Sequence, residues 1–388
     1  MKILIVAPTP YFSDRGAHVQ IYEQANAIKN FGHDVLILTY GIGRDVGDIR
    51  TKRCWTPKYY RKISAGPSFT KVFLIPVLAL YLIRLKCSFK PDVIHAHLHE
   101  GALIAKMTNK LKPTPTIFDY QGSLTEEVIQ SNWGKLPKLF YKILNFIESR
   151  INSWFPMVTQ SRKMQLEILE SRISRCAFDV INVRDGVDTK RFRPMDPDES
   201  LLQSLKIEPH HKRLIFMGYF SQHQGLFVLL DAFKVVLSQF REVTLILIGY
   251  PVTTILTDYI NQIGISENLR LIGRIDYFEV QKYLSLGQIA VAPKVSKTEG
   301  DGKIYNYMAM GLPVVTFDRD VSREILGDTG IYSVQQDSEF LAKALLATIL
   351  DSSDFGIRAR ERAVKELSWE LVGLELLNVY QKCLNGVN

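Results

Sequence analysis

The stretch that decides the fold is residues 299–317, EGDGKIYNYMAMGLPVVTF. Its pattern predicts a Gly-rich loop, a short helix that ends at Gly311, and a buried strand. Gly300 and Gly302 let the backbone pass close to a ligand, because neither residue carries a Cβ. Lys303 opens the helix, so free N–H groups, the positive end of the helix dipole and an ammonium group converge. The stretch therefore predicts an anion site, with phosphate as the usual anion, and a plain tight βα turn is the alternative.

Strands alternate with helices along the whole chain. In the first half, strands are expected at 2–7, 35–39, 92–97, 115–119, 157–160 and from 181. In the second half, they are expected at 214–217, 243–248, 269–272, 289–293 and 313–317. Helices between parallel strands cover both faces of a sheet. The fold class predicted is α/β, with two Rossmann-like doubly wound parallel-sheet domains.

A chain of 388 residues is long enough for two domains, each with its own core. The composition shifts near Pro194, which places the predicted boundary between residues 195 and 196. The second domain is expected to run to residue 366. Residues 367–388 are expected to form a final helix, with Leu374, Leu377, Tyr380 and Leu384 on one face.

The cysteines and the N-terminus indicate a cytoplasmic protein. The four cysteines are scattered without metal-ligand spacing, which suits a reducing compartment. The start of the chain has no signal-peptide pattern, because the apolar run at 3–6 is a short strand.

Positive charge is concentrated in the first half of the chain. Residues 1–195 hold 29 Lys and Arg against 16 Asp and Glu, and carry +13, whereas the remainder carries −5. Between residues 49 and 91 there are ten bases, no acid and interleaved aromatics. Three interpretations stay open: a solvated basic loop before a buried helix, a surface that docks on anionic lipid, and nucleic acid, for which no recognition motif is present. The apolar run at 72–83 is too short to span a bilayer.

Polar side chains follow two of the strands in the first half. His95, His97 and His99 alternate, so they point to the same side if the strand continues. They could bind a metal, could be structural, or could orient a substrate hydroxyl at the carboxyl end of a strand. Asp119 and Gln121 end the next strand.

Taken together, these landmarks resemble the retaining nucleotide-sugar glycosyltransferases of the fourth sequence family, which have the GT-B fold. The resemblance rests on the order of the Gly16 loop, DVIHAH at 92–97, DGVDTKRFRP at 185–194, GYFSQHQG at 218–225 and the stretch 299–317. The family fold implies an N-terminal acceptor domain, a C-terminal donor domain and a substrate cleft between them. The resemblance also implies that the final helix crosses back to the first domain.

The resemblance also implies roles for single residues. Gly16 would approach the donor diphosphate, and His97 would lie beside the transferred sugar. Glu299 would contact sugar hydroxyls, in a one-residue slip from the family position at Thr298. Gly300, Gly302 and Lys303 would receive the diphosphate. The remaining donor-site positions implied by the resemblance are Gly218, Tyr219, Gln224, Asn306 and Glu324.

Three of these positions depart from the family pattern. Tyr219 and Gln224 stand where the family usually has an Arg and a Lys, and Asn306 replaces the second Glu of the signature. Each lost charge-assisted contact is worth roughly 1.5–3 kcal/mol. We interpret the change as a coordinated replacement, in which Lys303 supplies one cation and Lys294 or Lys297 another.

The function predicted is transfer of a hexose or N-acetylhexosamine from a nucleoside-diphosphate sugar to a hydroxyl of a glycan or lipid-linked acceptor. No metal or other cofactor and no nucleic acid is expected. An anionic membrane is a further partner, contacted through residues 49–91 on its cytoplasmic side. A non-catalytic nucleotide- or glycan-binding module, or a sugar-nucleotide epimerase or phosphorylase, are the alternatives.

Overall fold

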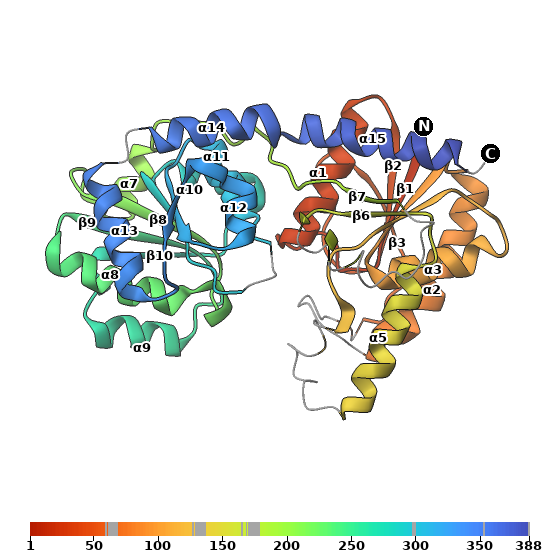
Figure 1. Cartoon of the computed structure of the whole chain (residues 1–388), viewed down its shortest axis with the longest axis horizontal. Coiled ribbons are helices and arrows are strands. Elements are labelled where there is room, and N and C mark those ends of the chain that lie inside the picture. The colour runs from red at the N-terminus through yellow and green to blue at the C-terminus, as the bar shows by residue number, and fades with distance from the viewer. Residues whose placement is uncertain are drawn as a thin grey trace. The chain divides into compact units, whose positions relative to one another are not determined.

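The chain forms two α/β units in a computed structural model (Figure 1). Unit 1 comprises residues 1–185 and 369–388, and unit 2 comprises residues 186–368. The structure describes residues 1–58, 60, 69–125, 128, 137–163, 166–167, 169, 179–296, 300–351 and 354–386. Glu299, Lys297, Arg61 and Lys62 lie outside these ranges.

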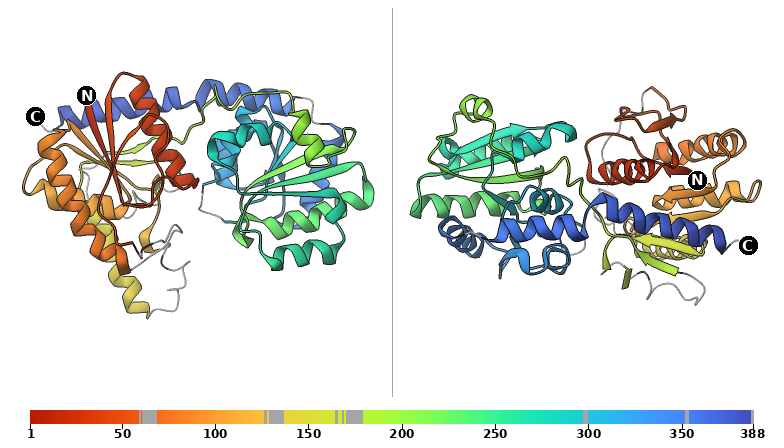
Figure 2. Two further views of the ribbon diagram at one scale, coloured as in Figure 1. Left: turned by 180° about the vertical axis from the view of Figure 1, so that it is seen from behind. Right: turned by 90° about the horizontal axis from the view of Figure 1, so that it is seen from above.

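Unit 1 is built on a seven-stranded parallel sheet with the order β3-β2-β1-β4-β5-β6-β7. The strands are β1 (Lys2–Ala7), β2 (Asp34–Thr39), β3 (Arg50–Arg53), β4 (Val93–His97), β5 (Thr116–Asp119), β6 (Met157–Gln160) and β7 (Asp179–Asn182). The helices are α1 (Gly16–Asn30), α2 (Phe69–Ser88), α3 (Leu98–Asn109), α5 (Lys138–Asn152) and α15 (Trp369–Asn385). The helices α1 and α15 lie side by side on one face, and α2, α3 and α5 pack on the other (Figures 1 and 2).

Unit 2 contains a six-stranded parallel sheet with the order β10-β9-β8-β11-β12-β13. The strands are β8 (Lys212–Tyr219), β9 (Val243–Tyr250), β10 (Leu269–Gly273), β11 (Ile289–Ala292), β12 (Val314–Phe317) and β13 (Gly330–Ser333). The helices are α7 (Glu199–Ser204), α8 (Leu226–Gln239), α9 (Thr254–Ile263), α10 (Val280–Leu284), α11 (Lys303–Ala309), α12 (Asp320–Leu326), α13 (Ser338–Leu350) and α14 (Phe355–Glu366). Short 3₁₀ turns occupy Gln222–Gln224, Ser266–Asn268, Tyr277–Glu279 and Gly327–Thr329.

The predicted fold class is confirmed, because both sheets are parallel and doubly wound. In unit 1 the strand order reverses between β1 and β4, and in unit 2 it reverses between β8 and β11. Ligands of open α/β sheets bind outside the carboxyl ends of the strands at such reversals. Each unit therefore has one preferred edge for a ligand.

The segment 186–195 belongs to unit 2, although the sequence places it in the first domain. Val187 pairs with Ser368, and the guanidinium of Arg360 donates to the carbonyl of Phe192 at 2.7 Å. These contacts explain why the boundary lies at Asp185 and not at residue 195.

The packed face of the C-terminal helix α15 overlaps the predicted one only in part. Tyr380 is buried as predicted, Leu377 and Leu384 are half-buried, and Leu374 is 46% exposed. Leu376 and Val379, which the prediction did not include, are buried. The helix turns this way because Gly373 faces α1, where an added Cβ would lie 3.0 Å from the Cβ of Ala27.

Candidate functional site

The loop after β1 is held in place by a buried histidine on α1. His18 is 2% exposed, and its ring nitrogens contact Thr9 Oγ1 at 2.5 Å and Ser13 Oγ at 2.9 Å. Burial, with a smaller contribution from the charge of Arg15, lowers the pKa of His18 to about 3, so the ring is neutral. Beside this loop Gly16 begins α1, and a Cβ there would meet no atom within 4 Å. The predicted approach of a diphosphate to Gly16 is therefore not blocked by atoms of unit 1.

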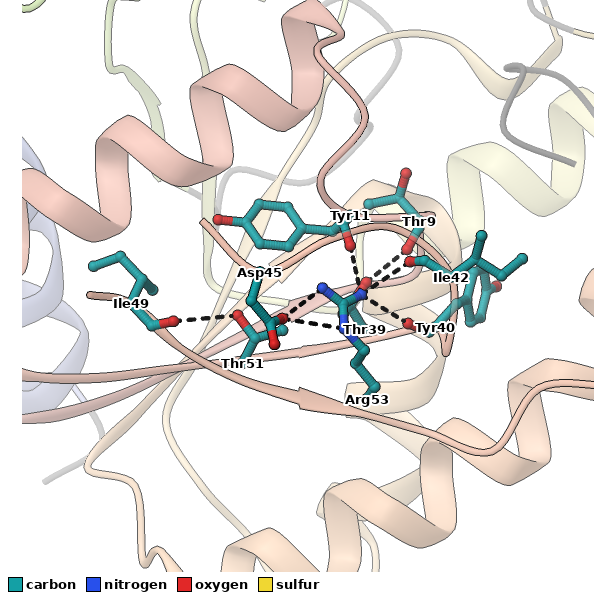
Figure 3. Close-up of polar contacts among 9 residues, drawn as sticks. All are labelled: Thr9, Tyr11, Thr39, Tyr40, Ile42, Asp45, Ile49, Thr51 and Arg53. Carbon is teal, nitrogen blue, oxygen red and sulfur yellow. Dashed lines mark hydrogen bonds and ion pairs between the residues drawn. The ribbon is translucent and has the colours of Figure 1, made fainter. Parts of the chain in front are cut away.

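Arg53 ties the same loop to the loop after β2. Its guanidinium donates to the carbonyl of Tyr11 at 2.5 Å and to that of Ile42 at 2.9 Å, and it pairs with Asp45 at 2.6 Å (Figure 3). Two backbone carbonyls and one carboxylate use most of the donors of one guanidinium. Arg53 thus fixes the loops at the carboxyl edge of the sheet and is not a free surface charge.

Other bases of the interval 49–91 are also used inside unit 1. Lys71 pairs with Glu100 at 3.0 Å. Lys86 is 1% exposed and donates to Asn109 Oδ1 at 2.5 Å, and burial lowers its pKa to about 8. The described bases of the interval that are exposed are Arg50, Lys52, Lys58, Arg84 and Lys90. The surface of this interval is less uniformly cationic than its sequence indicates, and its contact with a membrane stays a prediction.

His97 ends β4 in a buried pair with Asp119, at the end of the neighbouring strand β5. Its Nδ1 lies 2.8 Å from Asp119 Oδ2, which also accepts a hydrogen bond from Gln121 at 3.3 Å. Burial raises the pKa of Asp119, but His97, His95 and Gln121 together hold it below its ordinary value. The amide nitrogen of Gln121 also lies 3.0 Å from Nδ1, so Asp119 and Gln121 together fix the orientation of the ring. His97 Nε2 is buried without a hydrogen-bond partner among the described residues, so a sugar hydroxyl reaches it only when the covering atoms move aside.

The C-terminal helix reaches this pair through a second histidine. His95 is fully buried, and its Nδ1 lies 3.0 Å from the hydroxyl of Tyr380 on α15. The rings of His95 and His97 lie 4.4 Å apart, centroid to centroid. Burial, and to a smaller extent His97, lowers the pKa of His95 to about 3. Because His95 is neutral, His97 is the histidine that pairs with the charged carboxylate of Asp119.

The prediction that three histidines point to one side is wrong for His99. β4 ends at His97 and α3 begins directly after it, so His99 lies on a helix and contacts Asn152 Oδ1 at 3.1 Å. Among the described residues, the group with metal-ligand chemistry is His95, His97 and Asp119, whose ligand atoms lie within 4.8 Å of one another. The oxygen Oδ2 of Asp119 already contacts the ring of His97.

In unit 2, the amine of Lys303 lies between the start of α11 and the end of β8. Its Nζ is 2.7 Å from Gln224 Oε1, 3.0 Å from Asp301 Oδ1 and 4.9 Å from the ring centroid of Phe216. The amine lies beside the backbone of Gly218, where an added Cβ would lie at ordinary van der Waals distance from Nζ, 3.5 Å. The ammonium of Lys303 therefore stands beside Gln224, where the family pattern would place a cation. Burial lowers the pKa of Lys303, and Asp301 opposes this effect.

Two further buried cations lie close enough to Lys303 to act on its charge. The side chain of Arg319 is 3% exposed, with Nη1 3.9 Å from Asp301 Oδ2. Lys294 is 5% exposed and donates to the carbonyl of Gly300 at 2.7 Å. The charges of both act on the pKa of Lys303. The cluster therefore brings three buried cations to the carboxyl edge of the sheet in unit 2, where an anionic ligand would meet them. Sequence reasoning missed Arg319 and Asp301.

The other donor-site residues predicted from the sequence are more exposed than Lys303. Tyr219 is 53% exposed, and its ring packs edge-on against Tyr250 at 5.4 Å. Gly302 is exposed, and a Cβ there would meet nothing within 4 Å. Asn306 and Glu324 are half-buried on α11 and α12. The roles of these residues stay predictions, as does that of Glu299, which lies outside the described residues.

Two protein-family models match the chain, one in each unit. The model described as glycosyl transferase 4-like domain matches residues 15–181, and the model described as glycosyl transferases group 1 matches residues 211–351. The chain belongs to the glycosyltransferases. The matches cover both carboxyl-end edges described above, including His97 in the first model and Lys303 in the second.

Curated relatives of this glycosyltransferase include mycobacterial enzymes. It is 23% identical over 395 residues to the phosphatidyl-myo-inositol mannosyltransferase of Mycolicibacterium smegmatis, which covers 98% of this chain and 94% of the relative. The corresponding enzyme of Mycobacterium leprae is 24% identical over 295 residues, with 75% of this chain and 73% of the relative covered.

Solved structures show that the glycosyltransferase has the GT-B fold. Sucrose-phosphate synthase from Thermosynechococcus elongatus superposes with a TM-score of 0.78 at 16% identity, over 99% of both chains. Anabaena HepE in complex with UDP and glucose superposes with a TM-score of 0.77 at 15% identity, over 98% of this chain and 99% of the other.

Proposed function

We propose that this glycosyltransferase moves a hexose or N-acetylhexosamine from a nucleoside-diphosphate sugar to a hydroxyl of a glycan or lipid-linked acceptor. The observation that carries the proposal is a buried cluster in which Lys303 and Arg319 lie beside Asp301 and the charge of Lys294 acts on Lys303. A diphosphate brings negative charge to this buried cluster, and it would meet the cluster at the ligand-binding edge of unit 2. The complex of HepE with UDP supports the same donor class.

In the proposed reaction the anomeric configuration is retained by a front-face route. The bond between the anomeric carbon and the diphosphate oxygen breaks, and the bond to the acceptor oxygen forms on the same face. The acceptor proton passes to the departing phosphate oxygen. Lys303 and Arg319 would stabilise the charge that develops on the diphosphate, and His97 would orient the sugar. The proposal requires no metal ion, because the fixed cations supply the positive charge.

The acceptor side of the proposal comes from relatives. The mycobacterial phosphatidyl-myo-inositol mannosyltransferases are named for a lipid, and WaaG is a glycosyltransferase involved in lipopolysaccharide biosynthesis, similar to this chain with a TM-score of 0.71 at 13% identity. We propose a lipid-linked or glycan acceptor in the synthesis of a cell-envelope polysaccharide or glycolipid, at the cytoplasmic face of a membrane. Among the described residues, no helix has the length and apolar character needed to cross a bilayer.

A thermal-shift screen with UDP, GDP, ADP and their sugars tests the donor site. One nucleotide should raise the melting temperature, since a ligand at 100 times its Kd stabilises the folded state by about 2.7 kcal/mol. The variant Lys303→Ala should lose most of this shift. The matched control is Lys234→Ala, which removes an exposed amine on α8 and should keep the full shift.

Three outcomes would contradict the proposal. Equal thermal shifts in wild type and Lys303→Ala would show that the cluster is not part of the donor site. Donor binding without transfer or slow hydrolysis would identify a binding module. Product formed without an acceptor, or only with inorganic phosphate, would identify an epimerase or a phosphorylase.

A further inference from the structure

The helix α5 carries an apolar face that is exposed. Leu139, Ile143, Phe146 and Ile147 are 68%, 49%, 66% and 44% exposed, and Phe140 is 37% exposed. Their spacing of three and four residues places them along one side of the helix. Its first turns extend past α2 and α3 in both Figure 1 and the left view of Figure 2.

The opposite side of α5 is packed into unit 1. Glu148, Ile151 and Asn152 are 2%, 5% and 1% exposed. Glu148 accepts hydrogen bonds from the hydroxyl of Tyr120 at 3.1 Å and from that of Thr125 at 2.8 Å. These contacts fix the rotation of the helix. Its exposed side is therefore apolar where a surface helix normally carries polar side chains.

The charges that accompany this face are positive. The exposed charged side chains among the described residues of α5 are Lys142 and Arg150, and its one acid, Glu148, is buried. Arg150 follows Phe146 by four residues, so it lies on the apolar side, where its stem can lie in an apolar layer while its head reaches phosphate groups. The net charge of +13 over residues 1–195 adds a long-range attraction to anions.

We infer that α5 docks on a membrane that contains anionic lipid, with its apolar face in the boundary between headgroups and acyl chains. The face from Leu139 to Arg150 is about 16 Å long, which suits a helix that lies in the plane of the surface. Lys142 and Arg150 match anionic headgroups in charge. Two other occupants are less well matched. An acidic groove of another protein would match the positive charge of α5, and a second copy of this chain would cover its apolar face without supplying anions for Lys142 and Arg150.

The inference deepens the proposed function, on which it rests for the placement of the acceptor at a lipid surface. It moves the membrane contact from residues 49–91, where several bases are used internally, to the helix α5. Vesicle binding is measured without any sugar donor. The inference and the proposed function can therefore fail separately.

The test is flotation of the full chain with vesicles of phosphatidylcholine alone or with phosphatidylglycerol. We expect binding to the anionic vesicles, weakened by salt, and at least about tenfold weaker binding for Ile143→Ser combined with Phe146→Ser. The charge variant Lys142→Glu with Arg150→Glu should lose the preference for phosphatidylglycerol. The nucleotide-induced thermal shift should be unchanged in both, because the substitutions lie in unit 1 and the donor cluster lies in unit 2.

The chain offers matched controls for both variants. Ile255→Ser with Leu350→Ser removes apolar side chains that are 72% and 81% exposed in unit 2, and should leave flotation unchanged. Lys234→Glu with Lys343→Glu replaces two exposed cations of unit 2 by carboxylates, as the charge variant does on α5, and should keep the preference for phosphatidylglycerol. Absence of binding, or binding that Ile143→Ser with Phe146→Ser does not weaken, would overturn the inference. Sedimentation that shows a dimer abolished by the apolar variant would overturn it too, and would assign α5 to a second copy.

Discussion

The two ligand-binding edges of this glycosyltransferase differ in how their charges are balanced. At the edge of unit 1, His97 is paired with Asp119 and the neutral His95 with Tyr380. At the edge of unit 2, Lys303 and Arg319 lie beside the carboxylate of Asp301, and the charge of a third buried cation, Lys294, acts on Lys303.

This difference separates orientation from charge neutralisation. A balanced network holds a ring in one tautomer and one direction, which suits contact with a neutral sugar hydroxyl. In the proposed reaction, a group of buried cations would favour binding of a diphosphate and would stabilise it as it leaves. Substitutions at the cationic edge should therefore have larger effects than substitutions in the network.

The largest effect is expected for Arg319→Gln. Removing one buried cation from the developing charge should lower kcat/KM for the nucleotide sugar by about a hundredfold. Arg319→Lys keeps the charge and should recover much of the loss, although it lacks the planar fork. Steady-state kinetics of wild type, Arg319→Gln and Arg319→Lys provide the measurement, with their melting temperatures compared to show that the variants are folded. Equal losses in both variants would assign Arg319 a packing role.

A smaller effect is expected from pH. Burial lowers the pKa of Lys303 from the ordinary 10.5, so its amine loses its proton at a lower pH than an exposed lysine does. Because the charged amine binds the diphosphate, nucleotide affinity should fall as the pH rises through this lowered value, by up to about tenfold. Calorimetry across the alkaline range measures the change. Lys303→Arg should bind without this pH dependence, since a guanidinium does not titrate there. An identical fall in Lys303→Arg would exclude Lys303 as its source.

Strand and helix periodicity was sufficient to predict the two parallel sheets, because buried parallel strands appear as short apolar runs between helices. It missed the edge strands β3 and β13, whose sequences RTKR and GIYS are not apolar runs. It was not sufficient for α15, since the face that packs depends on the close approach of α1 to Gly373. The outward apolar face of α5 was hidden for a related reason. A helix with apolar residues on two sides has the same pattern as a helix buried on both, and only the structure shows which side is covered.

At the sites, glycines and a lysine at a helix start were enough to locate Lys303. Asp301 lies within the same motif but was passed over, because a carboxylate is not expected beside a phosphate. Arg319 follows the strand β12 and so lies at a carboxyl strand end, which was the one available signal for it. The contact between Tyr380 and His95 joins residues that are 285 positions apart, so local patterns carry no information about it.

The smallest effect is expected for Tyr380→Phe, which removes only the hydroxyl that contacts His95 Nδ1. The loss of one hydrogen bond should lower the free energy of unfolding by about 1 kcal/mol. His95 would then be free to change tautomer next to His97, and we expect kcat to fall about two- to fivefold while KM for the donor stays constant. Imidazole ¹⁵N chemical shifts of His95 and His97 report the tautomers directly.

Tyr40→Phe is the matched control for this variant. Tyr40 is as fully buried as Tyr380, but its hydroxyl has no hydrogen-bond partner among the described residues. Removing an unpaired buried hydroxyl costs no hydrogen bond and ends its desolvation cost, so stability should stay the same or rise, while kcat and both tautomers stay unchanged. If the two variants behave alike, the hydroxyl of Tyr380 only fills space. If Tyr380→Phe alone shifts the imidazole signals and kcat, the C-terminal helix is a positioning element for His97, and the orienting edge depends on the last helix of the chain.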